Sequence, residues 1–153
     1  MASKVRGIII PAIFFTAGIV FGGYLFADTR PRSILALNKC ENRCLKPNEL
    51  AGVVASVGIQ KFSYFIPSVV METDKTIVIK HPSPEARIHY VIIPKKDIKN
   101  IGEASEEDKA YLLDVFAVVS KIVKEQHLEQ YRVVTNGPAY QSATYLHFHL
   151  MAR

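Results

Sequence analysis

The feature that most constrains this chain is a long apolar run near its amino terminus. Residues 7–27, "GIIIPAIFFTAGIVFGGYLFA", contain no Asp, Glu, Lys or Arg. A helix of about 20 apolar residues crosses the roughly 30 Å hydrocarbon core of a bilayer. The run also contains glycines, which membrane helices tolerate better than soluble ones, at Gly18, Gly22 and Gly23. We therefore predict that residues 1–27 form a transmembrane anchor.

A cleaved secretory signal is the alternative interpretation of this segment. Lys4 and Arg6 would supply its basic start. The apolar run is longer than the core of a typical signal, however, and "LFAD" at residues 25–28 lacks the small-x-small pattern of a cleavage site. An uncleaved anchor is the favoured prediction.

The distribution of basic residues predicts the orientation of this anchor. Lys4 and Arg6 precede the apolar run, whereas five basic residues soon follow it: Arg30, Arg32, Lys39, Arg43 and Lys46. Because the basic flank of a span usually stays inside, we expect a single-pass protein with its folded part on the cytoplasmic (or matrix) side.

The charge of the folded part argues against nucleic-acid binding. The chain has a net charge of +5, of which Lys4 and Arg6 supply two units. No run of Lys or Arg interleaved with aromatic residues follows. Such a weak positive balance is more typical of proximity to anionic lipid headgroups than of a nucleic-acid partner.

Residues 28–59 are predicted to be a helical connector. Apolar residues recur at helical spacing over 33–46, and Pro47 would end that first helix. A second helix is expected over 47–59, with Asn48 as its N-cap and Gly58 closing it.

The first predicted connector helix contains both cysteines of the chain, Cys40 and Cys44. Their C-x3-C spacing would place them on adjacent turns. In a reducing compartment they would stay as thiols, and a metal site would need further ligands. We predict inert thiols here.

From residue 60 onward the pattern changes to that of an α+β fold. Strands are expected at 68–72, 76–81, 88–94, 131–136 and 144–151. Short links within the strand pairs favour an antiparallel sheet of about five strands. One long helix is expected over 105–127, with Ser105 as its cap. Its predicted sheet-facing stripe is Ala110, Leu113, Phe116, Ala117, Ser120 and Val123.

The last predicted strand, "TYLHFHLM", alternates apolar and polar side chains. Side chains at i and i+2 share one face of a strand, so Tyr145, His147 and His149 project together. The opposite face carries Leu146, Phe148 and Leu150, which we expect in the core. Imidazole titrates near neutral pH and serves as a nucleophile or an acid and base, so this polar face is a candidate site.

The loop "TNGPAYQSA" lies just before these imidazoles. Asn136, Gly137, Gln141 and Ser142 offer backbone amides, side-chain amides and a hydroxyl. Such donors suit phosphate oxygens. An ordinary turn is the alternative, because Asn-Gly-Pro is a strong turn pattern.

Two longer stretches resemble a known family. "HPSPEARIHYVIIPKKDIKNI", a helix, and then "YRVVTN…QSATYLHFHLMAR" look like the histidine-triad (HIT) superfamily, in its Hint-like branch. The resemblance runs over residues 60–153, which we take as a HIT-like domain. The family has three histidines at alternate strand positions, and here the first of the three positions is Tyr145.

The resemblance implies a nucleotide-binding α+β domain, commonly a homodimer. The middle histidine of the family attacks phosphorus and forms a nucleotidyl-histidine, a role that falls on His147. His149 would bind phosphate or assist the leaving group. Ser142 would donate to phosphate, Asn136 lies in the matching phosphate loop, and His89 matches a histidine of the active-site cluster.

Two positions depart from the family pattern. In the family the backbone carbonyl at the position of Tyr145 can orient the nucleophile, which any residue could supply, and the Tyr145 phenol can still form hydrogen bonds. His81 stands where many relatives carry an acidic residue for ribose hydroxyls. Some relatives bind zinc through a cysteine pair and histidines. Cys40 and Cys44 are spaced differently, and we expect no metal and no cofactor.

Two functions follow. The first is a membrane-anchored nucleotidyl hydrolase or transferase acting on a nucleotide or nucleotide conjugate. The alternative is a catalytically inactive HIT-like accessory subunit of a membrane complex, with apolar helix stripes that dock partners.

Overall fold

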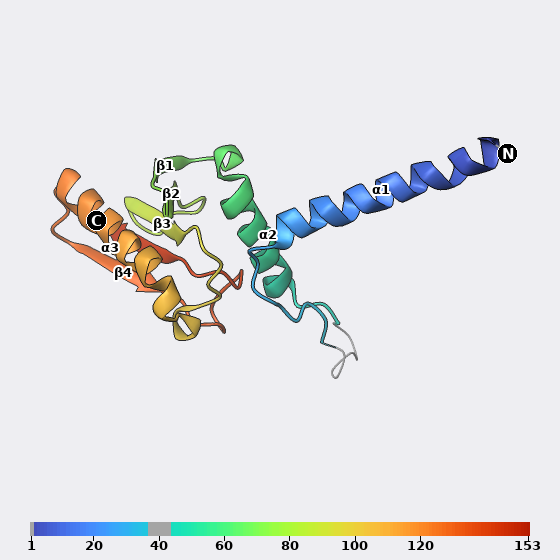
Figure 1. The fold of residues 1–153 in the computed structure, drawn as a ribbon. Helices are drawn as coiled ribbons and strands as arrows, with labels where there is room; N and C mark the ends of the chain where they lie inside the picture. Colours follow the sequence, from blue (N-terminus) through green and yellow to red (C-terminus); the bar gives the residue numbers. More distant parts are fainter. Residues whose placement is uncertain (1, 37–43) are drawn as a thin grey trace.

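A computed structural model describes residues 2–36 and 44–153 of the chain (Figure 1). The three α-helices among these residues are α1 (Ala2–Phe26), α2 (Pro47–Lys61) and α3 (Lys109–Glu125). Short 3₁₀ turns are η2 (Ser63–Phe65), η3 (Ile101–Glu103) and η4 (Glu106–Asp108). The strands are β1 (Val69–Glu72), β2 (Thr76–Lys80), β3 (Ile88–Pro94), β4 (Tyr131–Thr135) and β5 (Phe148–Ala152).

The strands form one antiparallel sheet in the order β1-β2-β3-β5-β4. The β1–β2 hairpin turns at Thr73, whose backbone N–H donates to the Thr76 carbonyl over 2.8 Å. The predicted α+β class, with about five strands and one long helix, is confirmed.

Helix α3 covers one face of the sheet, but with a different stripe from the predicted one. Its buried residues are Val115, Val118, Val119 and Ile122. Of the predicted stripe, Val123 is half-buried, while Ala110, Leu113, Phe116, Ala117 and Ser120 are exposed. The prediction was wrong because the helix carries two apolar stripes, and the β-branched one packs against the sheet.

The buried stripe of α3 packs on side chains from the central strands. Val78, Ile92, Phe148 and Leu150 belong to this cluster, together with Leu146 just before β5. The last predicted strand therefore does turn Leu146, Phe148 and Leu150 into the core, as its alternation indicated.

Helix α2 packs on the opposite face of the sheet, at one end. Ile59 lies in a second buried cluster with side chains from β2, β3 and the segment before β5: Ile77, Val91, Ile93 and Tyr145. Figure 1 shows α2 between α1 and the sheet. Helix α2 thus covers part of the sheet face that carries the histidines.

The first predicted connector helix, over 33–46, is wrong in its described part. Leu35 and Leu45 form an antiparallel β-bridge, and the Lys46 N–H donates to the Ile34 carbonyl over 2.9 Å. These bonds between two extended segments of the chain replace the i to i−4 bonds of a helix. Residues 37–43 lie outside the described part of the chain.

The second connector helix is confirmed, with different ends. Helix α2 begins at Pro47, with Lys46 rather than Asn48 at the N-cap, and runs past Gly58 to Lys61. Cys44 is disulfide-bonded, so the thiol prediction is wrong for this residue. Cys40 lies outside the described residues.

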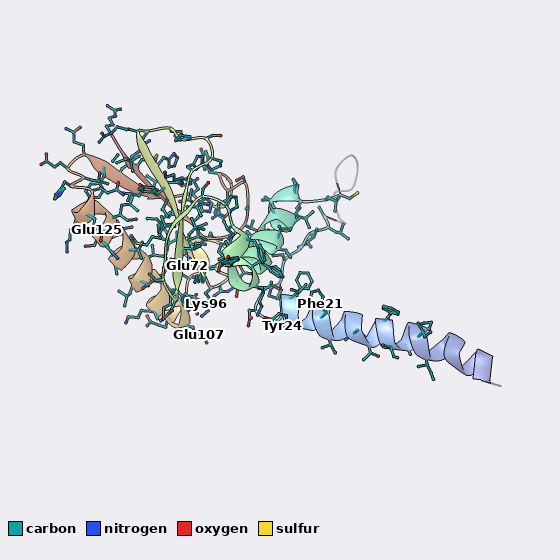
Figure 2. The ribbon with its side chains drawn as sticks, turned by 90° about the horizontal axis from the view of Figure 1, so that it is seen from above. Phe21, Tyr24, Glu72, Lys96, Glu107 and Glu125 are labelled. Carbon is teal, nitrogen blue, oxygen red and sulfur yellow. The ribbon has the colours of Figure 1, made fainter. Side chains whose placement is uncertain are left out.

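Helix α1 extends away from the rest of the chain (Figure 2). Its segment Ile9–Phe26 is long and apolar enough to cross a membrane, by length and composition, and none of it is buried. Its last turn meets α2, where the Lys61 ammonium lies 4.6 Å from the centre of the Tyr24 ring and 2.6 Å from the Asp28 carboxylate.

Helix α2 approaches the segment before β5 very closely at Gly52. The Thr144 N–H donates to the Asn48 carbonyl over 3.0 Å. A Cβ at Gly52 would lie 2.8 Å from the Thr144 carbonyl oxygen and 2.8 Å from Arg32 Nε. Only glycine fits between these groups without a shift of the backbone.

Gly52→Ala is therefore expected to lower the free energy of unfolding by about 1–3 kcal/mol, the usual cost of overpacking. The matched control is Gly58→Ala in the same helix, because no atom lies within 4 Å of a Cβ there. Gly58→Ala should be neutral or stabilising, since alanine favours the helix by up to about 1 kcal/mol. Urea unfolding of both variants measures the difference. Equal effects at the two positions would contradict the close packing of Gly52.

Candidate functional site

The candidate site lies where β5 begins, on the sheet face that α2 partly covers. Strand β5 starts at Phe148, so His147 directly precedes it, whereas 144–151 was predicted as strand. The reason is that the Leu146 N–H donates to the Ile98 carbonyl over 2.6 Å instead of joining a strand ladder. His147 is thus placed at the end of a tethered loop.

A cavity of about 380 Å³ opens at this position. Six of the eight predicted site residues line it: His81, Asn136, Ser142, Tyr145, His147 and His149. Gln141 does not line it. Its side chain is buried, and its Nε2 lacks a hydrogen-bond partner among the residues that the structure describes. The structure thus separates Gln141 from the other candidates.

The eighth predicted residue, His89, is buried beside this cavity. It lines an adjoining cavity of about 240 Å³ with His149, Asn136 and Arg132. His89 comes from β3 and His149 from β5, which pair directly in the sheet. The two cavities therefore meet at His149.

The hydrogen bonds of His147 determine which ring nitrogen is free. Its Nδ1 lies 2.8 Å from the Tyr145 carbonyl oxygen. A carbonyl only accepts, so Nδ1 carries the proton of the neutral ring, and Nε2 keeps its lone pair. His147 is therefore held in the tautomer that a nucleophile requires, and its orienting partner is a backbone atom.

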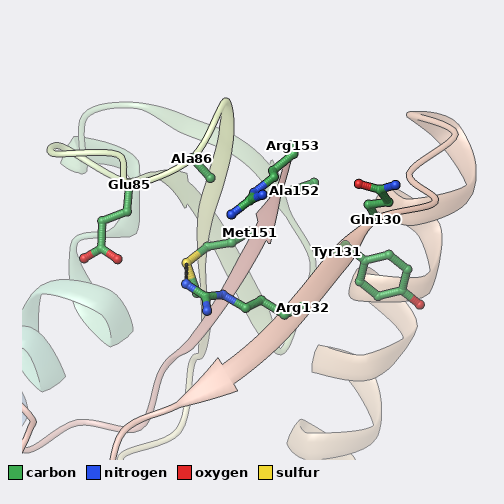
Figure 3. Close-up of a pocket in the computed structure, with 8 residues that line it drawn as sticks. All are labelled: Glu85, Ala86, Gln130, Tyr131, Arg132, Met151, Ala152 and Arg153. Atoms are coloured by element: carbon green, nitrogen blue, oxygen red, sulfur yellow. Dashed lines mark hydrogen bonds between the residues drawn. The ribbon is translucent and has the colours of Figure 1, made fainter.

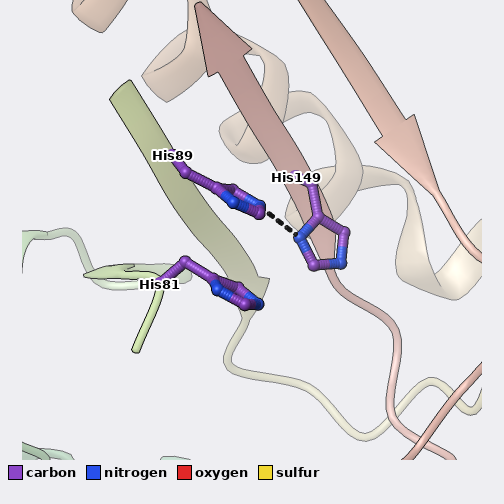
Figure 4. A group of neighbouring side chains, drawn as sticks. All are labelled: His81, His89 and His149. Atoms are coloured by element: carbon purple, nitrogen blue, oxygen red, sulfur yellow. Dashed lines mark hydrogen bonds between the residues drawn. The ribbon is translucent and has the colours of Figure 1, made fainter. Parts of the chain in front are cut away.

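His89 and His149 form a directed hydrogen-bond chain (Figure 4). The Glu85 N–H donates to His89 Nδ1 over 3.1 Å, so the proton of the neutral His89 ring is on Nε2. That Nε2 lies 2.9 Å from His149 Nδ1 and donates to it. The proton of His149 is then on its own Nε2, which becomes a donor.

His81 completes this group of imidazoles. Its ring stacks parallel to His89, with centres 4.1 Å apart. The Ser83 N–H donates to His81 Nδ1 over 3.1 Å, so His81 also carries its proton on Nε2. At the position where relatives have an acidic acceptor, this chain presents an N–H donor.

Distance alone would let His81, His89 and His149 hold a metal ion, since their ligand atoms lie within 4.8 Å of one another. The hydrogen bonds do not fit this role. A ligating imidazole needs a lone pair on the coordinating nitrogen and donates its other N–H to an acceptor. In His81 and His89, Nδ1 instead accepts a backbone N–H. The neutral rings therefore keep their proton on Nε2, the nitrogen that would have to bind the metal. As hydrogen-bonded here, the three rings do not favour a metal ion.

The environment of His149 favours its neutral form. Burial lowers its pKa, and the neighbouring His147, His89 and His81 lower it further, to about 4. The pKa of His89 is also lowered, first by burial and then by His81. At neutral pH the His149 ring is thus an uncharged donor.

We expect the His149 ring to titrate near pH 4 in an NMR titration of histidine-labelled protein. Between this value and about 6.5 the unfolded chain binds a proton that the native ring does not. The contribution of His149 to stability therefore falls as the pH drops through this window. His89→Phe removes the donor to Nδ1 and should raise the pKa of His149. Titration near 6.5 in the unsubstituted protein would contradict this account.

Tyr145 is more deeply buried than the sequence suggested, with 1% of its surface exposed. Its hydroxyl donates to the Pro94 carbonyl over 2.9 Å, and burial raises the pKa of this phenol. The side chain therefore contributes packing and one hydrogen bond, while its carbonyl orients His147.

A further cavity of about 360 Å³ lies at the β4–β5 edge (Figure 3). Arg132, Met151 and Arg153 line it, and Arg132 Nη2 lies 3.7 Å from the Met151 sulfur. None of the predicted site residues belongs to it.

Sequence reasoning missed the side chains that α2 brings to the main cavity. Ala55 and Ile59 line it, as does the exposed Tyr140. The four-residue spacing of Ala55 and Ile59 on one helix face was the available signal. The sequence did not show that this helix face lies against the cavity of His147 and His149.

Comparison with known proteins agrees with this geometry. Residues 65–153 match the family described as "Scavenger mRNA decapping enzyme C-term binding". A HIT-like protein of Synechococcus elongatus described as uncharacterized is 37% identical over 86 residues, which cover 54% of this chain and 75% of that protein. A second such protein, from Chlamydia muridarum, is 34% identical over 85 residues, covering 54% and 68%.

Solved structures show the same fold. A HIT family hydrolase from Clostridium thermocellum has a TM-score of 0.57 and 29% identity, covering 63% of this chain and 89% of that one. A Hit-like protein from Bartonella henselae has a TM-score of 0.51 and 33% identity, covering 60% and 74%. The chain therefore belongs to the histidine-triad (HIT) superfamily, through the family of the scavenger mRNA decapping enzyme C-terminal region.

Proposed function

We propose that this protein binds a nucleotide or nucleotide conjugate and transfers its nucleotidyl group through His147. The observation that carries the proposal is the free Nε2 lone pair of His147, fixed by the bond from Nδ1 to the Tyr145 carbonyl. An acidic side chain or a third imidazole is not needed to set this tautomer.

The chemical step forms a bond between His147 Nε2 and the α-phosphorus, while the bond from phosphorus to the leaving group breaks. The His149 Nε2–H donates a hydrogen bond to a phosphoryl oxygen or to the departing atom, and the departing atom takes its proton from water, because the neutral ring keeps its own N–H. Water or another acceptor then attacks phosphorus and releases its proton to solvent, the phosphorus–nitrogen bond breaks, and the His147 lone pair is restored.

The cavity offers complementary groups for the rest of the ligand. Ser142 and Asn136 line the same cavity as His81 and supply hydrogen-bond donors for phosphate oxygens. Ala55 and Ile59 form an apolar wall that suits a base. The His81 N–H would donate to a sugar oxygen.

Incubation of the full-length protein in detergent with a nucleoside 5′-phosphoramidate, and separately with a dinucleoside polyphosphate, tests this function. We expect release of nucleoside monophosphate and, after a rapid alkaline quench, a nucleotidyl mass increase on the peptide that contains His147. Absence of turnover, adduct and binding with both substrates would contradict the proposal.

We also propose that residues 1–27 anchor the protein, with residues 28–59 connecting to the HIT-like domain at 60–153. Support comes from the exposed apolar segment Ile9–Phe26. The domain would face the cytoplasm or matrix. Alkaline carbonate extraction and the intact mass of the mature chain distinguish an anchor from a removed signal.

An accessory subunit is the second candidate function. Two exposed apolar groups support it: Leu113 and Phe116 on α3, and Leu50 and Val54 on α2. The α3 pair also suits a homodimer. Purification in mild detergent separates these outcomes, because an accessory subunit should keep stoichiometric companions and a free dimer should not.

A further inference from the structure

The segment that follows α1 is attached to the candidate site by one buried arginine. Arg32 lies outside the family match at residues 65–153. Its side chain is 1% exposed and forms an ion pair with Asp97, which is also 1% exposed. A charge this deeply buried is retained only when its partners satisfy it.

All five N–H groups of the Arg32 guanidinium have acceptors. Nη1 and Nη2 each donate to one Asp97 carboxylate oxygen over 2.5 Å. The second N–H of Nη1 donates to the Arg30 carbonyl over 3.1 Å. Nη2 also donates to the Thr144 carbonyl at 2.7 Å, and Nε to the Thr144 hydroxyl at 3.2 Å. Arg32 therefore joins the chain after α1 to the loop before β5.

Thr144 is held from the other side by α2. Its N–H donates to the Asn48 carbonyl over 3.0 Å, and its hydroxyl lies 3.0 Å from a Glu49 carboxylate oxygen. Gly52 allows this approach, as described above. Both the backbone and the side chain of Thr144 are thus fixed by residues that precede the family match.

Thr144 is the neighbour of the atom that orients the nucleophile. The Tyr145 carbonyl accepts a hydrogen bond from the His147 Nδ1–H. Ser142, two residues before Thr144, lines the cavity. The Thr144 carbonyl belongs to the peptide unit directly before the one that contains the Tyr145 carbonyl, so we expect the loss of its anchor to change the position of the Tyr145 carbonyl.

We propose that Arg32 is a positioning residue for His147, so that the segment after α1 assembles the site. Arg32 acts by holding Thr144 and hence the Tyr145 carbonyl. The inference rests on the proposed role of His147, and it assigns to the amino-terminal part of the chain a function in the chemistry of the domain.

Arg30, two residues earlier, provides a matched control. Its guanidinium donates to the Asp108 carboxylate at the start of α3, over 2.8 and 3.0 Å, and to the Glu103 carbonyl. Among the described residues, its side chain forms no hydrogen bond or ion pair with the 141–147 loop, although its backbone N–H donates to Asp97 and its carbonyl accepts from Arg32. Loss of the Arg30 side chain should affect stability without moving the nucleophile.

The test compares three variants of the full-length protein in detergent: Arg30→Met, Arg32→Lys, and the double variant Arg32→Met/Asp97→Leu. The double variant removes both members of the buried ion pair, so no uncompensated charge remains to unfold the chain. Arg32→Lys keeps the charge but lacks the planar fork that reaches both Asp97 and Thr144.

The expected result for the double variant is cooperative unfolding, a kcat with a phosphoramidate substrate lowered at least tenfold, and a smaller change in KM. Arg32→Lys should recover part of this loss, and Arg30→Met should keep kcat within about twofold. A stably folded double variant with unchanged kcat would overturn the proposal, as would an equal loss of kcat in Arg30→Met.

A readout without substrate separates this inference from the proposed function. Hydrogen exchange of the amides of Thr144, Tyr145 and Leu146 should accelerate at least tenfold in the double variant and remain unchanged in Arg30→Met. The NMR signal of the His147 Nδ1 proton should weaken in parallel. If the unsubstituted protein turns over no nucleotide but these changes occur, the positioning role stands and the catalytic one fails. Unchanged exchange would overturn the positioning role.

Discussion

His147→Ala is expected to reduce turnover of a nucleoside phosphoramidate by about 10³-fold or more, the scale on which enzymes lose activity when a covalent nucleophile is removed. The ring lines the cavity, and the Tyr145 carbonyl fixes its tautomer so that Nε2 keeps a lone pair. Initial rates and the alkaline-quench mass measurement check the result together, because the nucleotidyl adduct should vanish with the activity.

Tyr145→Phe is the matched variant for this measurement. It keeps the backbone carbonyl that orients His147 and loses only the hydroxyl bond to the Pro94 carbonyl. Turnover should stay within a few-fold of the unsubstituted rate, with a loss of stability of about 1 kcal/mol or somewhat more. Residual activity of His147→Ala near the normal rate would show that His147 is not the nucleophile.

Asp97→Ala is expected to lower the free energy of unfolding by about 3–5 kcal/mol, because it leaves the Arg32 charge buried and unpaired. Arg32 and Asp97 are each 1% exposed, so solvent cannot replace the lost carboxylate without opening the packing. Urea unfolding at pH 7 in the same detergent measures the change.

Glu107→Ala serves as the control for Asp97→Ala. Glu107 is exposed near the start of α3 (Figure 2), and its loss should change stability by no more than about 0.5 kcal/mol. Asp97→Ala/Arg32→Met should recover much of the stability that Asp97→Ala loses. A small effect of Asp97→Ala alone would mean that water reaches Arg32 and that the pair is not a buried one.

Most of the strands could be predicted because their signals are local. The Thr73 turn, the apolar run of β3 ended by Pro94, and the spacing of Leu146, Phe148 and Leu150 each depend on a few neighbouring residues. The start of β5 could not, since it depends on a hydrogen bond from Leu146 to Ile98, 48 positions earlier in the chain.

The candidate site divides in the same way. The alternation of Tyr145, His147 and His149 placed these residues together, and they do share a cavity. The direction of each proton on His81, His89 and His149 was not available from the sequence. It depends on which backbone N–H or ring nitrogen each imidazole meets after the strands have paired.

The α+β class, the apolar amino-terminal helix and the shared strand face of His147 and His149 could be predicted from the sequence, because periodicity and composition act within a few residues. The entry of the segment after α1 into the folded part depends on tertiary contacts. Arg32, Asp97 and Thr144 are far apart in sequence, and burial brings them to hydrogen-bonding distance. An arginine read from the sequence as a flanking charge of a membrane span is, once buried, a structural neighbour of the His147 loop.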